Sequence, residues 1–543
     1  MRRAWGPLSA VLATQAMAEP KFEDHTASLP PHTYQGDWHH FVGGGLAVFD
    51  CNGDSLPDVF AAGGSAPATL LRNDGGFRFS TAPLPTLTGV TGAYPIDINA
   101  DGLLDLFVLR VGPNVALQGK GDCTFEHATA RWGLPPQDQW STAFTAWWED
   151  DPRPVMAIGN YVDRTDPDGP FEACDSNVIL RPEGEGYRAE KLEPGFCALS
   201  ILAAKDASGQ SRLRLSNDRH YYVSGGHEQM WDIATRRFLG PEDGWQNVSL
   251  WGMGIASRDL TGDGRDEVML TSMGDQLLQI ASLDGTYTSA PFSIGTYAQR
   301  PHVGGDGRPS TGWHAEFGDI DNDGRADLFI AKGNVDQMPG MASRDPNNLL
   351  MPQPAGTFQE KAAEAGVADP ERSRGAALVD VDLDGRLDLI VSNRRAPLML
   401  YRNVTQNTGN WLRIDLRQAG GNRHAIGASI TVTTVQHSQT LQRIIGGGHA
   451  GGQLLPLHIG LGTAPAADIT VTWPDGTGTT HHTPANQHIL LQNPYSDRQS
   501  PLPRRCLLRL QHTPGWPPNH RPAPSFWPKI SLHPRTHKHL ASG

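Results

Sequence analysis

The sequence contains no long apolar run and few cysteines. In 543 residues there is no stretch of about 18 apolar residues, so no membrane span is predicted. Five cysteines are too few for a disulfide scaffold, and none of their spacings suits a zinc site. Long amphipathic helical patterns are also missing. What remains is a chain of short strand-like runs separated by turns rich in glycine and acid.

The acidic charge is unevenly distributed. The formal net charge is −13, yet residues 493–543 hold eight Lys or Arg and one Asp. The rest of the chain is therefore more acidic than the total suggests, which argues against nucleic acid as a partner. The tail 493–543 is rich in Pro, His and Arg without periodicity, and we predict that it is disordered. Docking of this tail on an anionic surface, or an extension without a role, both stay open.

The first eighteen residues resemble a secretory signal. Arg2 and Arg3 form a charged start, Leu8 to Ala13 is a modest apolar stretch, and residues 16–18 fit a small-residue cleavage site. We therefore predict a secreted or periplasmic protein. The alternative is an unstructured cytosolic N-terminus.

Cysteine usage agrees with export. Cys174 and Cys197 bracket one hairpin-like insertion and could pair locally, and Cys51 and Cys123 are candidates for a bridge between neighbouring repeats. Neither pairing follows from sequence alone, and Cys506 is left over in the tail.

One nine-residue acidic pattern occurs five times. Acidic residues stand at positions one, five and nine, with another oxygen-bearing side chain at position three. The copies are Asp50, Asn52, Asp54 and Asp58; Asp97, Asn99, Asp101 and Asp105; Asp259, Thr261, Asp263 and Glu267; Asp319, Asp321, Asp323 and Asp327; and Asp380, Asp382, Asp384 and Asp388. Alternating oxygen donors around a tight turn suit a hard, flexible cation, so we predict several Ca²⁺ ions.

The five loops differ in quality. Loops 319–327 and 380–388 offer four carboxylates each and are the strongest candidates, and loop 97–105 offers three with an amide. Loop 259–267 departs with Thr261 and Glu267, and loop 50–58 has Ser55 where the others have glycine, which puts its turn geometry in doubt. An EF-hand is excluded because position twelve is always apolar and the flanks are strands. Asp-Gly turns without metal are the alternative.

The spacing of the loops predicts the architecture. Loop starts are separated by 47 residues (50 to 97), 60 (259 to 319) and 61 (319 to 380). The interval from 97 to 259 has room for two eroded repeats, at Trp147–Asp151 and Asp206–Gly209. Seven units of about 55 residues with several short strands each predict an all-β, seven-bladed β-propeller. The last unit has no closing strand of its own, and we predict that Phe22–Thr26 supplies it.

These loops with their flanking strands resemble the FG-GAP (VCBS) repeats of integrin alpha-type propellers. Residues 410–492 resemble an ASPIC/UnbV domain through Asn410-Trp411-Leu412, Gly446-Gly447-Gly448, the His458–Gly462 motif and Trp473-Pro474-Asp475-Gly476. Together they are similar to the cartilage acidic protein family and its bacterial relatives over roughly residues 40–492. The resemblance implies an exported, calcium-binding propeller at 19–406 and a small β-rich domain at 407–492. It implies no particular chemistry.

Polar and aromatic clusters outside the loops raise a second hypothesis. Asp218 and His220 in one cluster, and Trp313 and His314 in another, are candidate ligand-binding residues. Packing between blades is the favoured interpretation of both clusters. The leading function is therefore a non-enzymatic scaffold for a protein or glycan ligand. The alternative is an exported hydrolase or lyase that acts on a saccharide through the His220/His314 region.

Overall fold

A computed structural model describes residues 18–166, 173–218, 225–297 and 305–495. The regular secondary structure of the described chain is almost entirely β-strand, with one short α-helix at Ala362–Ala365 and four short 3₁₀ helices. The all-β prediction is therefore confirmed. The predicted signal segment up to residue 17, the tail from residue 496, Cys506 and His220 lie outside the described residues.

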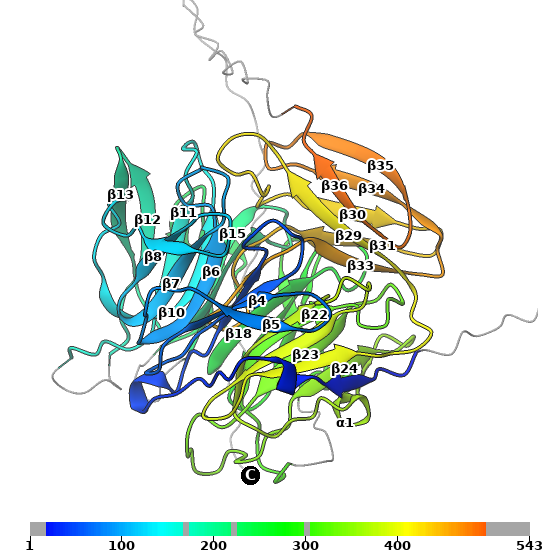
Figure 1. Cartoon of the computed structure of the whole chain (residues 1–543), viewed down its shortest axis with the longest axis horizontal. Helices are drawn as coiled ribbons and strands as arrows, with labels where there is room; N and C mark the ends of the chain where they lie inside the picture. The colour runs from blue at the N-terminus through cyan, green and yellow to red at the C-terminus, as the bar shows by residue number, and fades with distance from the viewer. Residues whose placement is uncertain (1–17, 167–172, 219–224, 298–304, 496–543) are drawn as a thin grey trace, which may run out of the picture. The chain divides into compact units, whose positions relative to one another are not determined.

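Most strands in the first four hundred residues pair in antiparallel units of four (Figure 1), and pairing of Asp138–Trp140 with Val111–Pro113 joins the second unit to the third in one sheet. The units are β2 (Leu46–Phe49), β3 (Asp58–Ala61), β4 (Thr69–Asn73) and β5 (Phe79–Ala82); β6 (Val90–Ile96), β7 (Asp105–Pro113), β8 (Val115–Gly119) and β9 (Phe125–His127); β10 (Asp138–Trp147), β11 (Val155–Asn160), β12 (Asn177–Glu183) and β13 (Gly186–Leu192); β14 (Ala198–Lys205), β15 (Ser211–Asn217), β16 (Gln229–Asp232) and β17 (Arg237–Phe238); β18 (Gly252–Arg258), β19 (Glu267–Ser272), β20 (Leu277–Ala281) and β21 (Tyr287–Ser289); β22 (Gly312–Gly318), β23 (Asp327–Lys332), β24 (Asn348–Pro352) and β25 (Phe358–Glu360); and β26 (Ser373–Val379), β27 (Asp388–Asn393) and β28 (Met399–Asn403) with β1 (Phe22–Asp24).

The first strands of these units form a ring. β2, β6, β10, β14, β18, β22 and β26 each contact the next strand in this order, and β26 contacts β2. Strands such as β3, β19, β23 and β27 are buried along their whole length, because both faces of each sheet pack against neighbouring sheets. This is the closed arrangement of a β-propeller, in which no unit buries its apolar residues alone.

The N-terminal strand completes the last unit, as the sequence predicted. β1 pairs with β28 in the register Phe22 opposite Asn403. Phe22 is 5% exposed and packs in a cluster with Tyr401 and Phe329. The strand is shorter than predicted, because the chain turns into a 3₁₀ helix at Thr26–Ser28.

The C-terminal domain has two sheets around its own core. One sheet has the order β33-β29-β36 and the other β31-β30-β34-β35. Its strands are β29 (Asn410–Arg417), β30 (Ser429–Thr433), β31 (Ser438–Gln442), β33 (Leu457–Gly462), β34 (Ala466–Thr472), β35 (Gly478–Pro484) and β36 (Gln487–Gln492). Leu412, Ile430 and Trp473 are among the residues of its core.

A glycine-rich segment of this domain enters the ring of first strands. Gly446 bridges to Leu202 of β14, Gly448 to Ile255 of β18 and Gly451 to Ala93 of β6. β32 (Gln453–Leu454) then pairs in parallel with β2. A Cβ atom at Gly451 would lie 2.2 Å from the Leu46 carbonyl oxygen, so the close approach requires glycine. The Gly446–Gly448 run thus lies in the connection between β31 (Ser438–Gln442) and β32.

Both predicted disulfides are present. Cys51 bonds Cys123 and links the β2–β5 unit to the β6–β9 unit. Cys174 bonds Cys197, which immediately precedes β14, and the β12–β13 hairpin lies between the two cysteines. Among the described residues, no helix is long and apolar enough to cross a membrane.

Candidate metal centres in the blade loops

Each acidic loop connects the first two strands of its unit. The acid at position nine is the first residue of the second strand in all five loops: Asp58, Asp105, Glu267, Asp327 and Asp388. The acid at position one directly follows the last residue of the first strand in all five loops. The ladder between the two strands therefore holds the ends of the loop at fixed positions.

Backbone N–H groups hold the acidic side chains in a shared pattern. The acid at position nine accepts from the N–H of position two, as in Asp327 from Ile320 at 2.7 Å and Asp388 from Val381 at 2.9 Å. The aspartate at position one accepts from the N–H of position six at 2.8–3.0 Å, as in Asp319 from Gly324. These bonds turn the carboxylates of one loop toward its interior.

The turn needs a left-handed backbone at position six. Gly102, Gly264, Gly324 and Gly385 have φ between 83° and 93° there, and Ser55 adopts φ 71°. Loop 50–58 therefore has the same turn as the other loops. Its serine occupies a conformation that costs a residue with a Cβ roughly 1–2 kcal/mol.

Loop 319–327 brings three buried carboxylates close together. One ligand oxygen from each of Asp319, Asp321 and Asp327 lies within 4.8 Å of the others, and each residue is 1% exposed. Burial and the neighbouring carboxylates raise the pKa of Asp319 and Asp327 far above the usual range and that of Asp321 to about 7. Asp321 Oδ2 is buried without a partner among the described residues. A divalent cation would compensate this crowded negative charge.

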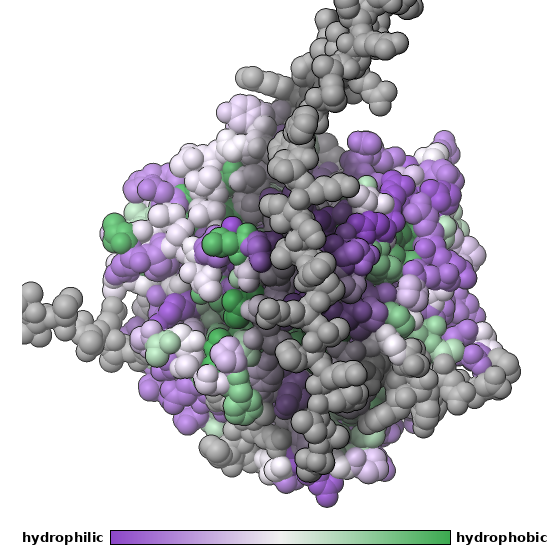
Figure 2. Space-filling view, turned by 180° about the vertical axis from the view of Figure 1, so that it is seen from behind, coloured by the Kyte–Doolittle hydropathy of each residue, from purple (hydrophilic) through white to green (hydrophobic). Residues whose placement is uncertain are grey.

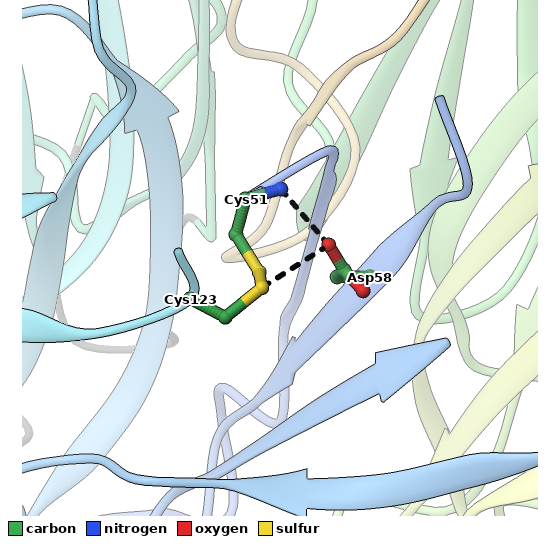
Figure 3. Close-up of side chains that lie close together, drawn as sticks. All are labelled: Cys51, Asp58 and Cys123. Carbon is green, nitrogen blue, oxygen red and sulfur yellow. Dashed lines mark hydrogen bonds between the residues drawn. A yellow bond between two sulfur atoms is a disulfide. The ribbon is translucent and has the colours of Figure 1, made fainter. Parts of the chain in front are cut away.

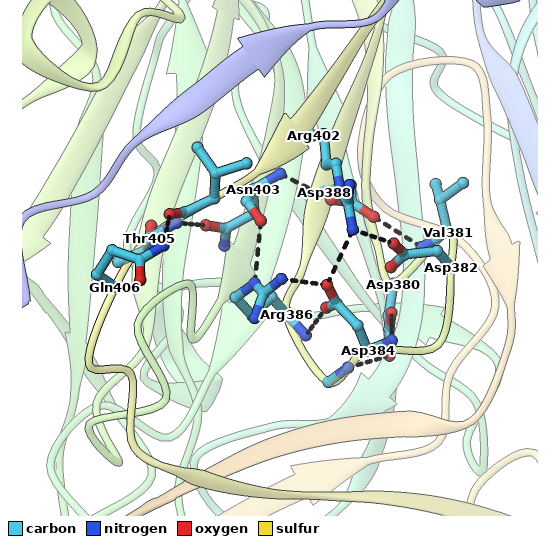
Figure 4. Close-up of polar contacts among 12 residues, drawn as sticks. Asp380, Val381, Asp382, Asp384, Arg386, Asp388, Arg402, Asn403, Thr405 and Gln406 are labelled. Atoms are coloured by element: carbon cyan, nitrogen blue, oxygen red, sulfur yellow. Dashed lines mark hydrogen bonds and ion pairs between the residues drawn. The ribbon is translucent and has the colours of Figure 1, made fainter. Parts of the chain in front are cut away.

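Loop 380–388 forms a second such group (Figure 4). Oxygens of Asp380, Asp382 and Asp388 lie within 4.8 Å of one another. Burial raises the pKa of Asp388 well above its usual range and that of Asp380 to about 6. Arg402 Nη2 lies 2.7 Å from Asp382 Oδ2, whereas Asp382 Oδ1 is buried without a partner in the described chain. Arginine therefore supplies part of the counter-charge here.

Loops 97–105 and 259–267 are more open. Among the described His, Cys, Asp and Glu residues, neither loop forms a group of three ligand atoms within 4.8 Å. Burial nevertheless raises the pKa of Asp105 to about 8, of Asp97 to about 6 and of Glu267 to about 7. Glu267 Oε1 is buried without a partner in the described chain. Asn99 donates a hydrogen bond through Nδ2 to Asp101 Oδ2 at 2.8 Å. Two of the predicted metal ligands of loop 97–105 are therefore hydrogen-bonded to each other.

Loop 50–58 lies beside a disulfide (Figure 3). Asp58 Oδ2 accepts from Cys51 N–H at 2.9 Å and lies 3.6 Å from Cys123 Sγ. Because a disulfide sulfur carries no hydrogen, the second approach is a contact and not a donated hydrogen bond. The Cys51, Asp58 and Cys123 group is likewise no thiolate metal site. Burial raises the pKa of Asp58 to about 7.

The predicted ligand-binding clusters are largely buried. Trp313 is fully buried, and its Nε1 donates to the Gly333 carbonyl at 2.7 Å. Arg374 lies over its ring at 4.0 Å from the centroid. Asp218 is 8% exposed and accepts from Tyr161 Oη at 2.6 Å. These contacts agree with packing between blades.

His314 has a different environment. It is 6% exposed and lines a cavity where the C-terminal domain meets the ring. Its Nδ1 accepts from His449 N–H at 3.2 Å, so Nε2 faces Glu316 Oε2 at 3.3 Å as the donor. No pairing with His220 is described.

Two asparagines outside the nine-residue pattern support the loops. Asn73 N–H donates to Asp58 Oδ1, and its Nδ2 donates to the Val381 carbonyl at 2.9 Å. Asn403 N–H donates to Asp388 Oδ1 in the same way. The Arg-Asn pair occurs at both Arg72–Asn73 and Arg402–Asn403, and this repetition is the sequence pattern that could have indicated the role of the two asparagines.

Comparison with known proteins agrees with these observations. An FG-GAP-like repeat family model matches residues 50–108 and 259–330, and an ASPIC and UnbV model matches residues 418–498. Cartilage acidic protein 1 from Homo sapiens is 29% identical over 198 residues, which cover 35% of this chain and 29% of that protein. The Xenopus tropicalis protein of the same name is 31% identical over 163 residues, covering 29% of this chain and 25% of that protein.

The chain carries FG-GAP-like repeats and an ASPIC and UnbV domain, and it is similar to cartilage acidic protein 1 over part of its length. The matched part spans less than a third of the length of these relatives. Two solved structures are similar at 10% identity. BP39L lectin from Burkholderia pseudomallei has a TM-score of 0.44 over 68% of this chain and 98% of its own, and BBS1N in complex with ARL6DN has 0.43 over 71% and 97%. Likenesses this weak carry no inference about function.

Proposed function

We propose that this protein is an exported, calcium-binding β-propeller that acts as an interaction scaffold for a protein or glycan ligand. Ca²⁺ would have a structural role in the blade loops. The observation that carries the proposal is the pair of crowded carboxylate groups in loops 319–327 and 380–388, each with a buried oxygen that has no partner in the described chain.

The residues fit a hard divalent cation. Asp319, Asp321, Asp323 and Asp327 would hold it in one loop, and Asp380, Asp382, Asp384 and Asp388 in the other, with a backbone carbonyl at position seven. The cation would neutralise carboxylates that burial otherwise forces toward protonation. It would thereby fix the first two strands of each unit relative to each other.

Two disulfides support export. Each connects segments of neighbouring units, and such bonds persist in oxidising compartments. A stable ring with rigid loops is suited to presenting a binding face.

The surface favours a ligand held by polar contacts. On the face shown in Figure 2, apolar residues are scattered among hydrophilic ones wherever the surface is visible. Only six large apolar side chains are exposed among the described residues: Leu103, Leu283, Phe292, Val435, Leu490 and Tyr495. The burial of Asp218 and Trp313 offers no support to the hydrolase or lyase alternative.

The test is calcium titration by calorimetry and thermal unfolding, on protein from which metal has been removed. We expect saturable binding and a higher Tm, since a site at 100 times its Kd contributes about 2.7 kcal/mol of stability. The variants Asp321→Asn and Asp388→Asn should each lower the number of bound ions. Asp284→Asn is the matched control, because Asp284 stands in an Asp-Gly turn outside the loops. No calcium-dependent rise in Tm would refute the metal proposal, and glycan and protein screening of the loaded protein tests the scaffold role.

A further inference from the structure

A cavity of about 240 Å³ lies where the C-terminal domain meets the ring of first strands. Propeller strands β18, β22 and β26 contribute one part of its wall, and β29, β31, β33 and the glycine-rich segment contribute the other. The metal-binding role proposed for the acidic loops does not explain this cavity.

Two buried arginines line the cavity without a hydrogen-bonded carboxylate among the described residues, although carboxylates of the neighbouring loops act on them at longer range. Arg258 is 7% exposed, and its one hydrogen-bond acceptor among the described residues is Gln439 Oε1, 3.1 Å from Nη2. Its Nε is buried without a partner in the described chain. Arg413 is 4% exposed, and its closest carboxylate contact there is from Nη1 to Asp380 Oδ2 at 4.0 Å. That separation is too long for a hydrogen bond.

A third arginine shows the contrast. Arg443 is 2% exposed and also lines the cavity. It donates through Nη1 to the Leu455 carbonyl, and its Nη2 lies 3.4 Å from Asp415 Oδ1. Its charge is therefore paired within the C-terminal domain.

Three carboxylates line the cavity wall. Asp380 of loop 380–388 is the one that lies 4.0 Å from Arg413, and the other two are engaged elsewhere. Asp266 accepts from Ser257 Oγ at 2.7 Å and from Gln442 Nε2 at 2.9 Å. Glu316 accepts from Gln453 Nε2 at 2.6 Å through one oxygen, and through the other it faces His314. Neither lies within ion-pair distance of Arg258 or Arg413 in the described chain.

His458 lies close enough to Arg258 and Arg413 for the positive charge of both to act on it. His458 pairs with Arg413 across β33 and β29, and burial followed by Arg413 and Arg258 lowers its pKa to about 3. Asn322 donates through Nδ2 to the Gly385 carbonyl, so its Oδ1 accepts from His458 Nε2 at 2.7 Å. His458 is therefore neutral and does not add to the positive charge, and its buried Nδ1 has no partner in the described chain.

We propose that this cavity binds a small oxyanion, a carboxylate or a tetrahedral anion of the sulfate and phosphate type, held by Arg258 and Arg413. Guanidinium groups bind such anions through paired N–H donors, and a buried cation without a partner is costly. The anion would join the propeller to the C-terminal domain, because the two arginines belong to different domains.

The experiment uses sulfate and succinate as probes, in calorimetry and in thermal unfolding against sodium chloride of equal ionic strength. We expect one site per chain for at least one probe, with a Tm increase that chloride does not give. Arg258→Gln and Arg413→Gln should each weaken binding of that probe at least about tenfold. Arg188→Gln, on the exposed face of β13, should leave the affinity unchanged.

Several outcomes would overturn the proposal. They are no binding of either probe by the natural protein, or equal binding by the two cavity variants. If a glutamine variant does not fold, probe binding is measured with Arg413→Lys instead. The titration of the natural protein still tests whether the cavity binds an anion. Parallel titrations with and without calcium separate this result from the metal proposal, because sulfate binding without any calcium effect supports the cavity site alone.

Discussion

Asn403 donates through Nδ2 to the carbonyl oxygen of Ile320 at 2.9 Å. Asn403 ends β28, the third strand of the last propeller unit, whereas Ile320 is the second residue of the acidic loop in the preceding unit. The same Nδ2 lies 3.0 Å from the Leu387 carbonyl, and the backbone N–H of Asn403 donates to Asp388. One side chain thus joins two neighbouring candidate metal loops.

Asn403→Asp should destabilise the protein strongly. The change replaces a donor by an acceptor beside two buried carbonyl groups, and each unsatisfied buried group costs about 1–3 kcal/mol. We expect a loss of about 2–5 kcal/mol in urea unfolding. Gln406→Glu makes the same chemical change at an exposed site and should have little effect. Equal stability of the two variants would show that the link between the loops contributes nothing.

Arg402→Gln should increase calcium affinity at loop 380–388. Arg402 competes for Asp382 Oδ2 at 2.7 Å, and its side chain is 36% exposed, so the pair contributes only about 0.2–1 kcal/mol. We expect calcium to bind about two- to fivefold more tightly in calorimetry. Arg72→Gln is the matched control, because Arg72 precedes the equivalent Asn73 and pairs with Asp74 outside the loop. Weaker binding in Arg402→Gln would mean that the guanidinium supports the site.

Glu228→Gln should stabilise the protein above about pH 4.5, with the full effect above about pH 7. Burial raises the pKa of Glu228 from 4.5 to about 7, while its Oε1 accepts from Asn217 N–H at 3.0 Å. A raised pKa in the folded state means that the natural protein loses stability as pH rises from about 4.5 to 7. The variant keeps the acceptor and cannot ionise.

The free energy of unfolding at pH 8 should therefore favour Glu228→Gln by about 2–3 kcal/mol, and the two proteins should agree below pH 4.5. Urea unfolding of both proteins at several pH values measures this difference. The titration of the acidic loops cancels, because both proteins contain the same loops. Glu185→Gln, at an exposed turn, serves as control. A pH-independent difference would show that Glu228 is not protonated in the folded protein.

Replacing Cys51 and Cys123 by serine should lower stability through the unfolded state. The bond closes a separation of 72 residues, for which chain entropy predicts about 4 kcal/mol. Thermal unfolding under non-reducing conditions measures the loss. Cys506→Ser is the control, since Cys506 belongs to neither bond. An unchanged Tm in the double variant would indicate that the two blades are held by packing alone.

The strand pattern and the loops were predictable from sequence because each repeats. The position of β1 was also predictable, since β28 lacked a neighbour in its own unit. Ser55 illustrates the limit of such reasoning, because the left-handed turn at position six forms without glycine. Asp101 and Asn99 bind each other in loop 97–105, which residue types alone do not reveal.

The cavity could not have been predicted. Arg258 and Arg413 are 155 positions apart on different domains, and neither belongs to a motif. Their proximity follows from the entry of Gly446–Gly451 into the ring, which depends on backbone approaches that side chains would block. Sequence periodicity reports on each repeat, whereas this site lies where repeats meet a different domain.

The pairing of β1 with β28 also dictates an order of events during synthesis. β1 is made long before its partner and must wait until residues 399–403 have been made, so the ring stays open until then. Until then, the free edge of β1 and the exposed faces of the end units are available to other chains. Ring closure is a late, long-range step that depends on both ends of the propeller, and a chain interrupted before β28 would leave its own first strand without a partner.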